Sequence, residues 1–276
     1  MPHGNGFRGY RGAARKQSRL LHPSRAADPA AGVLEGPVRL NRYIARSGVS
    51  SRRKADELIA AGHVKVNGEV VTEMGLRVEP GDRVEVSGRT ISPQGLVYLL
   101  LNKPDDVITT NSDERGRRTV LDLVELPPSR KEGLFPVGRL DRHTVGALVI
   151  TNDGELAHRL MHPRYRIDKI YSIRTRDPVK PHQLDELRRG VMLEDGRAKA
   201  EQVAYVDPAN HHEIAMLLHE GRNRQVRRML EALGHGIERL ERTSYGGLTT
   251  EGIRRGKWRE LSVQEVRRLR RLVQLK

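Results

Sequence analysis

Residues 138–146 read Gly-Arg-Leu-Asp-Arg-His-Thr-Val-Gly and run directly into the apolar residues 147–150. The two glycines and the polar residues between them predict a loop, and the apolar run predicts the buried strand that follows it. Asp141 stands between Arg139 and Arg142, and neighbouring guanidinium groups favour the ionised form of a carboxyl group. An ionised carboxylate held at the edge of a strand can act as a nucleophile or a general base. The same pattern also fits a turn aspartate that only forms a surface ion pair, and this stretch alone leaves both interpretations open.

Segments on both sides of this loop alternate between strand-like and helix-like patterns. Helical spacing of apolar residues follows the turn at Asn152-Asp153-Gly154, and a second helix over residues 225–233 follows the basic loop 220–224. Ser262-Val263-Gln264-Glu265 has the spacing of a capping box and predicts a C-terminal helix with a basic tail. Residues 97–276 are therefore expected to form one α+β domain. Its strands are predicted at residues 97–101, 147–151, 169–175 and 213–218.

Residues 37–92 predict a smaller unit of two helices followed by a small sheet. Ser50 or Ser51 has the side chain needed to cap the second helix. Asn67-Gly68 between alternating apolar residues is a strong signal for a β-hairpin. A further turn is expected to lead into a last strand over residues 83–86.

The whole chain is strongly basic. It has 276 residues with 50 Lys and Arg against 35 Asp and Glu, a formal net charge of +15. Such a field attracts polyanions, of which nucleic acid is the commonest, although a merely soluble basic protein would show the same excess. Residues 1–36 are rich in Gly, Ala, Arg and Pro without a hydrophobic period, and they predict a disordered basic arm.

Features that the sequence lacks exclude several classes of protein. The chain has no cysteine, which excludes disulfides, a cysteine nucleophile and cysteine-containing zinc sites. No apolar run approaches the roughly 20 residues that span a bilayer. No apolar signal segment opens the chain. A cytoplasmic protein without a membrane partner is therefore expected.

Basic side chains gather on the predicted helices and hairpin of residues 37–92. Residues 47–68 (SGVSSRRKADELIAAGHVKVNG) resemble the alpha-L RNA-binding domain, named after the small-subunit ribosomal protein S-four. The resemblance implies recognition of structured RNA by its shape and its phosphates, whereas the charge pattern alone also fits a solvated helix face. The side chains expected to contact RNA are Arg39, Arg42, Arg52, Arg53, Lys54 and Lys65.

Three motifs in a fixed order connect the larger domain with a known family. Residues 136–165 (PVGRLDRHTVGALVITNDGELAHRLMHPRY), 169–171 (KIY) and 218–235 (LHEGRNRQVRRMLEALGH) resemble the RsuA/RluB branch of the ribosomal RNA pseudouridine synthases. The resemblance, which covers residues 38–270, implies a catalytic domain built on a mixed, largely antiparallel sheet flanked by helices. It also implies catalytic roles for Asp141, Tyr171 and Arg227. Val226 is expected to pack against the target base.

The chemistry of that family suits these residue types. Pseudouridine formation breaks the bond between uracil N1 and the ribose and rejoins the base through C5, with no net oxidation, so no cofactor is implied. The carboxylate of Asp141 would attack the ribose or assist its deprotonation, and the sequence leaves that choice open. Arg227 would pair with Asp141, and Tyr171 would stack on a base flipped out of its helix. Four arginines would contact phosphates around that nucleotide, namely Arg139, Arg142, Arg222 and Arg224.

The implied substrate is a uridine of ribosomal RNA, with the large subunit favoured, in free RNA or in a ribosome-assembly intermediate. A monomer is expected, because the RNA-binding surface should stay free. The alternative is a non-catalytic RNA-binding or ribosome-assembly module that retains the fold.

His158 and His162 have the spacing of a metal-binding pair on a helix, but Arg159 stands where a zinc protease has Glu, so no metal site is expected.

Overall fold

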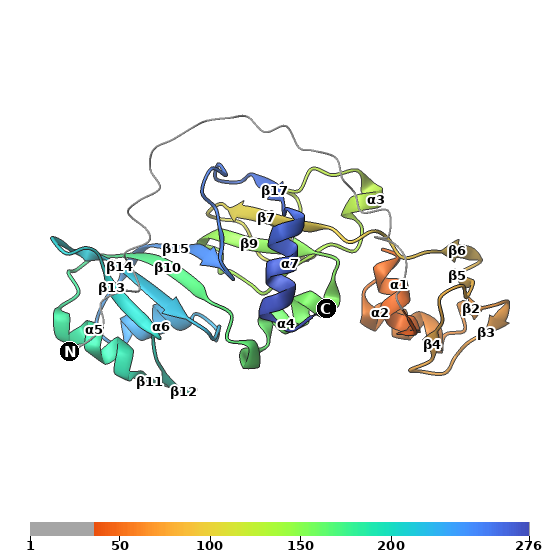
Figure 1. Ribbon diagram of the computed structural model, residues 1–276, viewed down its shortest axis with the longest axis horizontal. Coiled ribbons are helices and arrows are strands. Elements are labelled where there is room, and N and C mark those ends of the chain that lie inside the picture. Colours follow the sequence, from red (N-terminus) through yellow and green to blue (C-terminus); the bar gives the residue numbers. More distant parts are fainter. Residues whose placement is uncertain (1–35, 276) are drawn as a thin grey trace.

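The computed structural model describes residues 36–275, which form two units joined by a short extended segment (Figure 1). The basic arm predicted for residues 1–36 lies outside the described residues, except for Gly36. Within the described part of the chain, no helix combines the length and the apolar character needed to cross a membrane.

The smaller unit packs two helices on a small sheet, as predicted. Its apolar residues meet in one core, in which Leu40, Ile44 and Ile59 are almost fully buried. Ser51 accepts a hydrogen bond from the backbone N–H of Lys54 and so caps the second helix. The elements are β1 (Val38–Arg39), α1 (Leu40–Arg46), α2 (Arg52–Ala60), β2 (Val64–Val66), β3 (Glu69–Val70), β4 (Arg77–Val78), β5 (Val84–Val86) and β6 (Arg89–Ile91).

The prediction that residues 83–86 form the last strand of this unit was wrong, because β6 follows β5. Ser87 and Gly88 have φ angles of 49° and 78°. Two successive left-handed residues make a tight turn, which returns the chain antiparallel to β5. The sheet therefore has four strands in the order β3-β2-β5-β6. The hairpin between β2 and β3 turns at Asn67-Gly68, as predicted.

The larger unit is built on a mixed sheet of nine strands, seven of which follow the order β13-β14-β10-β15-β9-β7-β17. Its pairs are antiparallel except for β15 and β9, which run parallel at the centre of the sheet. This confirms the mixed, largely antiparallel sheet. The strands are β7 (Tyr98–Lys103), β8 (Phe135–Pro136), β9 (Val145–Thr151), β10 (Lys169–Thr175), β13 (Gln202–Asp207), β14 (Asn210–Leu218), β15 (Ile237–Tyr245), β16 (Leu248–Thr249) and β17 (Trp258–Glu260).

Helices cover both faces of this sheet. Alternate residues of a strand point to opposite sides, and apolar residues on both sides pack against these helices. Leu99 and Leu101 of β7 face a core shared with α5 and α6, whereas Leu100 faces a core shared with α4 and α7. Helices α4 and α7 contact each other on that second side (Figure 1). The helices are α3 (Pro128–Lys131), α4 (Gly154–Met161), α5 (Pro181–Arg189), α6 (Gln225–Glu231) and α7 (Val263–Leu272). A separate hairpin of β11 (Val191–Leu193) and β12 (Gly196–Ala198) packs beside α6.

The two units touch through α1 of the smaller one. Arg42 donates to a carboxylate oxygen of Glu155, on α4, at 3.0 Å. The backbones of the two units also approach closely at Gly133, where an added Cβ would lie 3.3 Å from the carbonyl oxygen of Ala45. Arg42, which the sequence assigns to RNA, thus also joins the two units.

Candidate active site

A cavity of about 920 Å³ lies where three parts of the larger unit meet. These parts are the loop before β9, the paired strands β10 and β15, and the basic loop before α6. The cavity is lined by each of the residues that the sequence places in one site around a uridine, namely Asp141, Tyr171, Val226 and Arg227. Residues from all three motifs therefore surround one space.

Asp141 and Arg227 form an ion pair at the wall of the cavity. Arg227 Nε lies 3.8 Å from Asp141 Oδ2, and an Arg227 amino group donates to the carbonyl oxygen of His143 at 3.0 Å. The second contact fixes the guanidinium relative to the loop that carries the carboxylate. The side chain of Asp141 is 35% exposed and that of Arg227 is 15% exposed. The carboxylate is thus paired on one side and accessible on the other.

A buried lysine holds the same loop. Lys103, at the end of β7, has no exposed surface, and its Nζ donates to the carbonyl oxygens of Pro104, Arg142 and Thr144 at 2.9–3.1 Å. Burial lowers the pKa of Lys103 to about 8, although nearby carboxylates, including that of Asp141, oppose the shift. Sequence reasoning missed this residue. The available signal was a lysine that ends an apolar strand directly before a proline.

Tyr171 and Val226 give the cavity an apolar side. Tyr171 on β10 is 9% exposed and lies directly opposite Arg242 of β15 in the ladder. Residues opposite each other in a ladder share a face of the sheet, and both of these side chains line the cavity. Val226 faces the same space from the first turn of α6. A tyrosine ring beside an accessible carboxylate is suited to stacking on a flat base.

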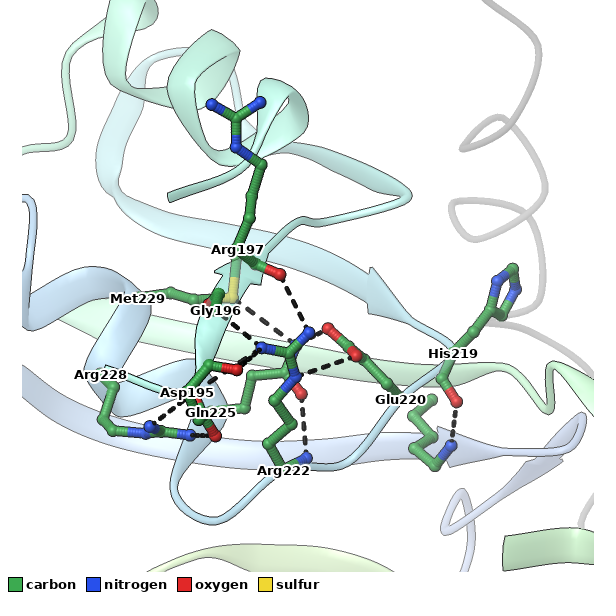
Figure 2. Close-up of polar contacts among 10 residues, drawn as sticks. Asp195, Gly196, Arg197, His219, Glu220, Arg222, Gln225, Arg228 and Met229 are labelled. Carbon is green, nitrogen blue, oxygen red and sulfur yellow. Dashed lines mark hydrogen bonds and ion pairs between the residues drawn. The ribbon is translucent and has the colours of Figure 1, made fainter. Parts of the chain in front are cut away.

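The basic loop before α6 is fastened to the β11–β12 hairpin (Figure 2). The guanidinium of Arg222 donates at 2.9–3.2 Å to three successive carbonyl oxygens of the hairpin turn, those of Asp195, Gly196 and Arg197. Its Nε donates to Glu220 at 3.1 Å. Most of the donors of Arg222 are therefore bonded within the protein, and the phosphate contact predicted for this residue stays a prediction.

The helix that carries Arg227 belongs to the same network (Figure 2). Arg228 makes two hydrogen bonds to the carboxylate of Asp195, at 2.9 and 3.0 Å. Gln225 is buried and accepts the backbone N–H of Arg222 at 3.0 Å. The position of Arg227 therefore depends on how the loop and the first turn of α6 are fixed to the hairpin.

The other arginines predicted to contact phosphates surround the mouth of the cavity. Arg139 is exposed. Arg142 is bonded to Asp106, and its side chain is 51% exposed. Arg224 lies 3.8 Å from Glu231, and its side chain is also 51% exposed. These three arginines thus line the cavity and are accessible, and the phosphate contacts expected of them stay predictions.

The basic residues predicted to contact RNA in the smaller unit are mostly accessible. Three of them form the first turn of α2, and a fourth lies on β2. Only Arg42 is engaged with the larger unit, through Glu155. The exposed members of the set are Arg39, Arg52, Arg53, Lys54 and Lys65.

His158 lies on α4 and His162 directly follows this helix, and the described residues provide no further metal ligands around them. His158 and His162 are exposed, with ring centroids 5.8 Å apart. Among residues 36–275, no three His, Asp or Glu side chains are grouped so that they could hold a metal ion. The described structure therefore gives no support for a metal centre there.

Comparison with known proteins finds relatives along most of the chain. Residues 97–232 match the family described as RNA pseudouridylate synthase, and residues 38–84 match the S4 domain. A Bacillus subtilis (strain 168) protein named ribosomal large subunit pseudouridine synthase B is 46% identical over 85% of this chain and 96% of its own length. An uncharacterized RNA pseudouridine synthase of Aquifex aeolicus (strain VF5) is 42% identical over 87% of this chain and 96% of its own. A solved pseudouridylate synthase structure, 28% identical, matches with a TM-score of 0.61 over 84% of this chain and 99% of that one.

Proposed function

The chain belongs to the RNA pseudouridylate synthases, and from that premise we propose that it converts a specific uridine of large-subunit ribosomal RNA to pseudouridine. It is an isomerase that acts on RNA. The choice of ribosomal RNA is supported by the 46% identity with a relative named for the large ribosomal subunit. The observation that carries the proposal is the accessible Asp141–Arg227 pair in a cavity lined by all three motifs.

We assign the bond-breaking step to Asp141. The guanidinium of Arg227 pairs with one side of the carboxylate, and the other side is accessible to a ribose. That carboxylate either attacks C1′ of the ribose or removes a proton from C2′, and in both cases the bond between C1′ and uracil N1 breaks. The base then turns and bonds to C1′ through C5, while Asp141 either leaves C1′ or returns the proton to C2′. C5 loses its proton, and N1 gains one. No net oxidation takes place, so the reaction needs no cofactor.

We assign the binding of the target nucleotide to the remaining residues around the cavity. A uridine stacked in a helix cannot reach Asp141, so the nucleotide must leave its stack. Its base would then lie against Tyr171 and Val226, which form the apolar side of the cavity. Its flanking phosphates would pass the accessible arginines at the mouth, Arg139, Arg142 and Arg224.

The partner is ribosomal RNA, either free or within an assembly intermediate, and the enzyme works in the cytoplasm as a monomer. One RNA molecule would contact both the first turn of α2 and the mouth of the cavity. A monomer leaves both of these surfaces open to that RNA.

Tritium release from ribosomal RNA transcripts labelled at C5 of uridine tests this function directly. Because C5 forms the new bond to the ribose, each turnover releases one label. We expect release from large-subunit RNA and not from small-subunit RNA. A protein that binds both RNAs tightly but releases no label from either would contradict the proposal.

Removing the charges at the start of α2 is expected to weaken RNA binding and to lower its salt dependence. In the Arg52→Gln, Arg53→Gln, Lys54→Gln variant, the slope of log Kd against log salt should fall by about 2 to 3, with kcat at saturating RNA unchanged. A filter-binding salt titration measures this slope. As a control, the same substitution is made at Lys180, Arg188 and Arg189 around α5. Equal slopes for both variants would contradict an RNA contact at α2.

Arg222→Lys is expected to lower kcat about tenfold with unchanged RNA binding, because an ammonium group cannot replace a guanidinium fork across three carbonyl oxygens. Steady-state kinetics and a salt titration of binding measure the two effects. Arg130→Gln, which removes a guanidinium paired with Glu260 outside the cavity, is the matched control. Weaker binding with a smaller salt slope and normal kcat would instead show that Arg222 contacts a phosphate.

The titration of two buried lysines predicts a loss of activity at alkaline pH. Burial, helped by the charge of Arg242, lowers the pKa of Lys169 to about 8, the same value as for Lys103. Above about pH 8 the neutral amines donate fewer hydrogen bonds to the loops that they hold. In the unfolded chain lysine keeps its proton up to about pH 10.4.

The unfolded chain therefore binds more protons than the folded one between these pKa values, so the two lysines raise the free energy of unfolding as the pH rises. We expect kcat to fall above about pH 8 although these groups do not promote unfolding there. A pH–rate profile, with a melting curve at each pH, separates the two quantities. A kcat that stays constant across this range would contradict the prediction.

A further inference from the structure

Arg242 of β15 is a buried cation that lines the cavity, and its contacts among the described residues include no carboxylate. It is 3% exposed. Its Nε donates to the carbonyl oxygen of Ala147 at 2.8 Å, and its guanidinium lies 4.7 Å from the centroid of the Tyr245 ring. One of its terminal amino groups, also buried, has no hydrogen-bond partner. Because a buried charge with unused donors is destabilising, this side chain is suited to binding an electron-rich group.

Strand pairing fixes Arg242 between the two parts of the site. In the ladders it lies opposite Tyr171 on β10 and opposite Gly146 on β9, the strand that follows the Asp141 loop. Thr144, at the end of that loop, also lines the cavity, and its buried hydroxyl has no hydrogen-bond partner either. Two residues with unpartnered polar groups thus line the cavity together with the tyrosine and the aspartate.

We propose that Arg242 donates to a carbonyl oxygen of the flipped uracil and stabilises the negative charge that the base acquires when its bond to the ribose breaks. This inference rests on the proposed function. When the C1′–N1 bond breaks, its electron pair stays on the base and spreads over N1, O2 and O4. Asp141 either bonds to C1′ or takes the C2′ proton, so charge and atoms balance in both cases. A fixed donor shielded from water is most effective where charge develops during a reaction.

Because Arg242 lies deep in the cavity, it is better placed to bind the base than a phosphate. The side chains of Arg142 and Arg224 at the mouth are 51% exposed, whereas Arg242 is 3% exposed. A phosphate stays hydrated and attached to the chain on both sides, while a flat base can enter beside Tyr171. Lys169 adds positive charge nearby, but its Nζ already donates to two backbone carbonyl oxygens. Lys169 thus has one donor left, whereas Arg242 uses only its Nε N–H in the described contacts, so this deeply buried cation has most of its donors left for the base.

Two variants test this role, Arg242→Gln and Arg242→Lys, the latter keeping the charge without the planar fork. With Arg242→Gln we expect kcat at saturating RNA to fall about 100-fold or more, Kd to stay within about threefold, and the salt slope of binding to stay constant. Arg242→Lys should recover part of kcat. Arg130→Gln, outside the cavity, should change none of these values. Weaker binding with a slope lower by about one and normal kcat would overturn the proposal, as would no change at all.

A second arm uses the wild-type protein, so it does not depend on whether a variant of a buried residue folds. The target uridine is replaced by 2-thiouridine or by 4-thiouridine, which exchanges one carbonyl oxygen for a poor hydrogen-bond acceptor. Both sulfur atoms make the base a better leaving group, so the two RNAs are compared with each other. We expect their turnover to differ about tenfold, with the slower RNA lacking the oxygen that Arg242 contacts. Equal turnover would overturn the proposal.

Turnover of unmodified RNA by the wild-type protein is measured first. If no turnover is found, both the proposed function and the role of Arg242 are contradicted. Normal turnover combined with equal rates for the two thio RNAs would count against the role of Arg242 alone.

Discussion

Asp141→Asn is expected to abolish pseudouridine formation, with kcat lower by about 10⁴-fold or more and RNA binding within about threefold of the wild type. Asparagine keeps the shape of the side chain but can neither attack the ribose as an anion nor accept its proton. Arg227 retains its hydrogen bond to the carbonyl oxygen of His143, so the loop should keep its position. Tritium release and a binding titration on the same RNA measure the two effects.

Asp106→Asn is the matched control for this variant. Asp106 is an accessible carboxylate that bonds Arg142, the residue next to Asp141, without lining the cavity. Its replacement removes one negative charge from the same region and should leave kcat within about threefold. Similar losses in both variants would show that charge near the loop, and not a reacting carboxylate, is what the enzyme needs.

Local signals explain why much of the fold could be predicted from the sequence. Asn67-Gly68 forms the hairpin turn because both residues adopt positive φ, which that dipeptide favours. Ser262 and Glu265 form the predicted capping box at the start of α7. The extra strand β6 was missed because Ser87-Gly88 turns the chain with a less specific pair of residues. Such signals act within a few residues, so they can be read without knowing the tertiary structure.

The residues missed around the cavity depend on strand pairing. Lys103 reaches the Asp141 loop because β7 lies beside β9, and Arg242 lies opposite Tyr171 only because β15 is inserted between β9 and β10. A lysine or arginine in a strand pattern otherwise predicts an exposed position, since these residues are rarely buried. The contact of Arg222 with the hairpin turn is likewise invisible in the sequence, because the two segments are about 25 residues apart along the chain. The register that brings these residues together is a long-range property.

Gly146→Ala is expected to destabilise the protein by at least about 3 kcal/mol and to remove activity. Gly146 has φ of 105°, and an added Cβ would lie 2.2 Å from the carbonyl oxygen of Arg242. Neither atom can move without opening the parallel pair of β9 and β15, which is joined at only two register positions. Opening it would separate the Asp141 loop from Tyr171 and Arg242. Chemical denaturation and tritium release measure both losses.

Gly252→Ala separates the clash from the backbone strain. Gly252 also has positive φ, 75°, but an added Cβ there would meet no atom within 4 Å. Its replacement should cost only about 1 kcal/mol and leave kcat unchanged. If the two variants were equally stable and equally active, the close approach of β9 and β15 would not be what positions the carboxylate. If only Gly146→Ala loses stability and activity, residue 146 must be glycine because the backbone of Arg242 occupies the space that a side chain would need.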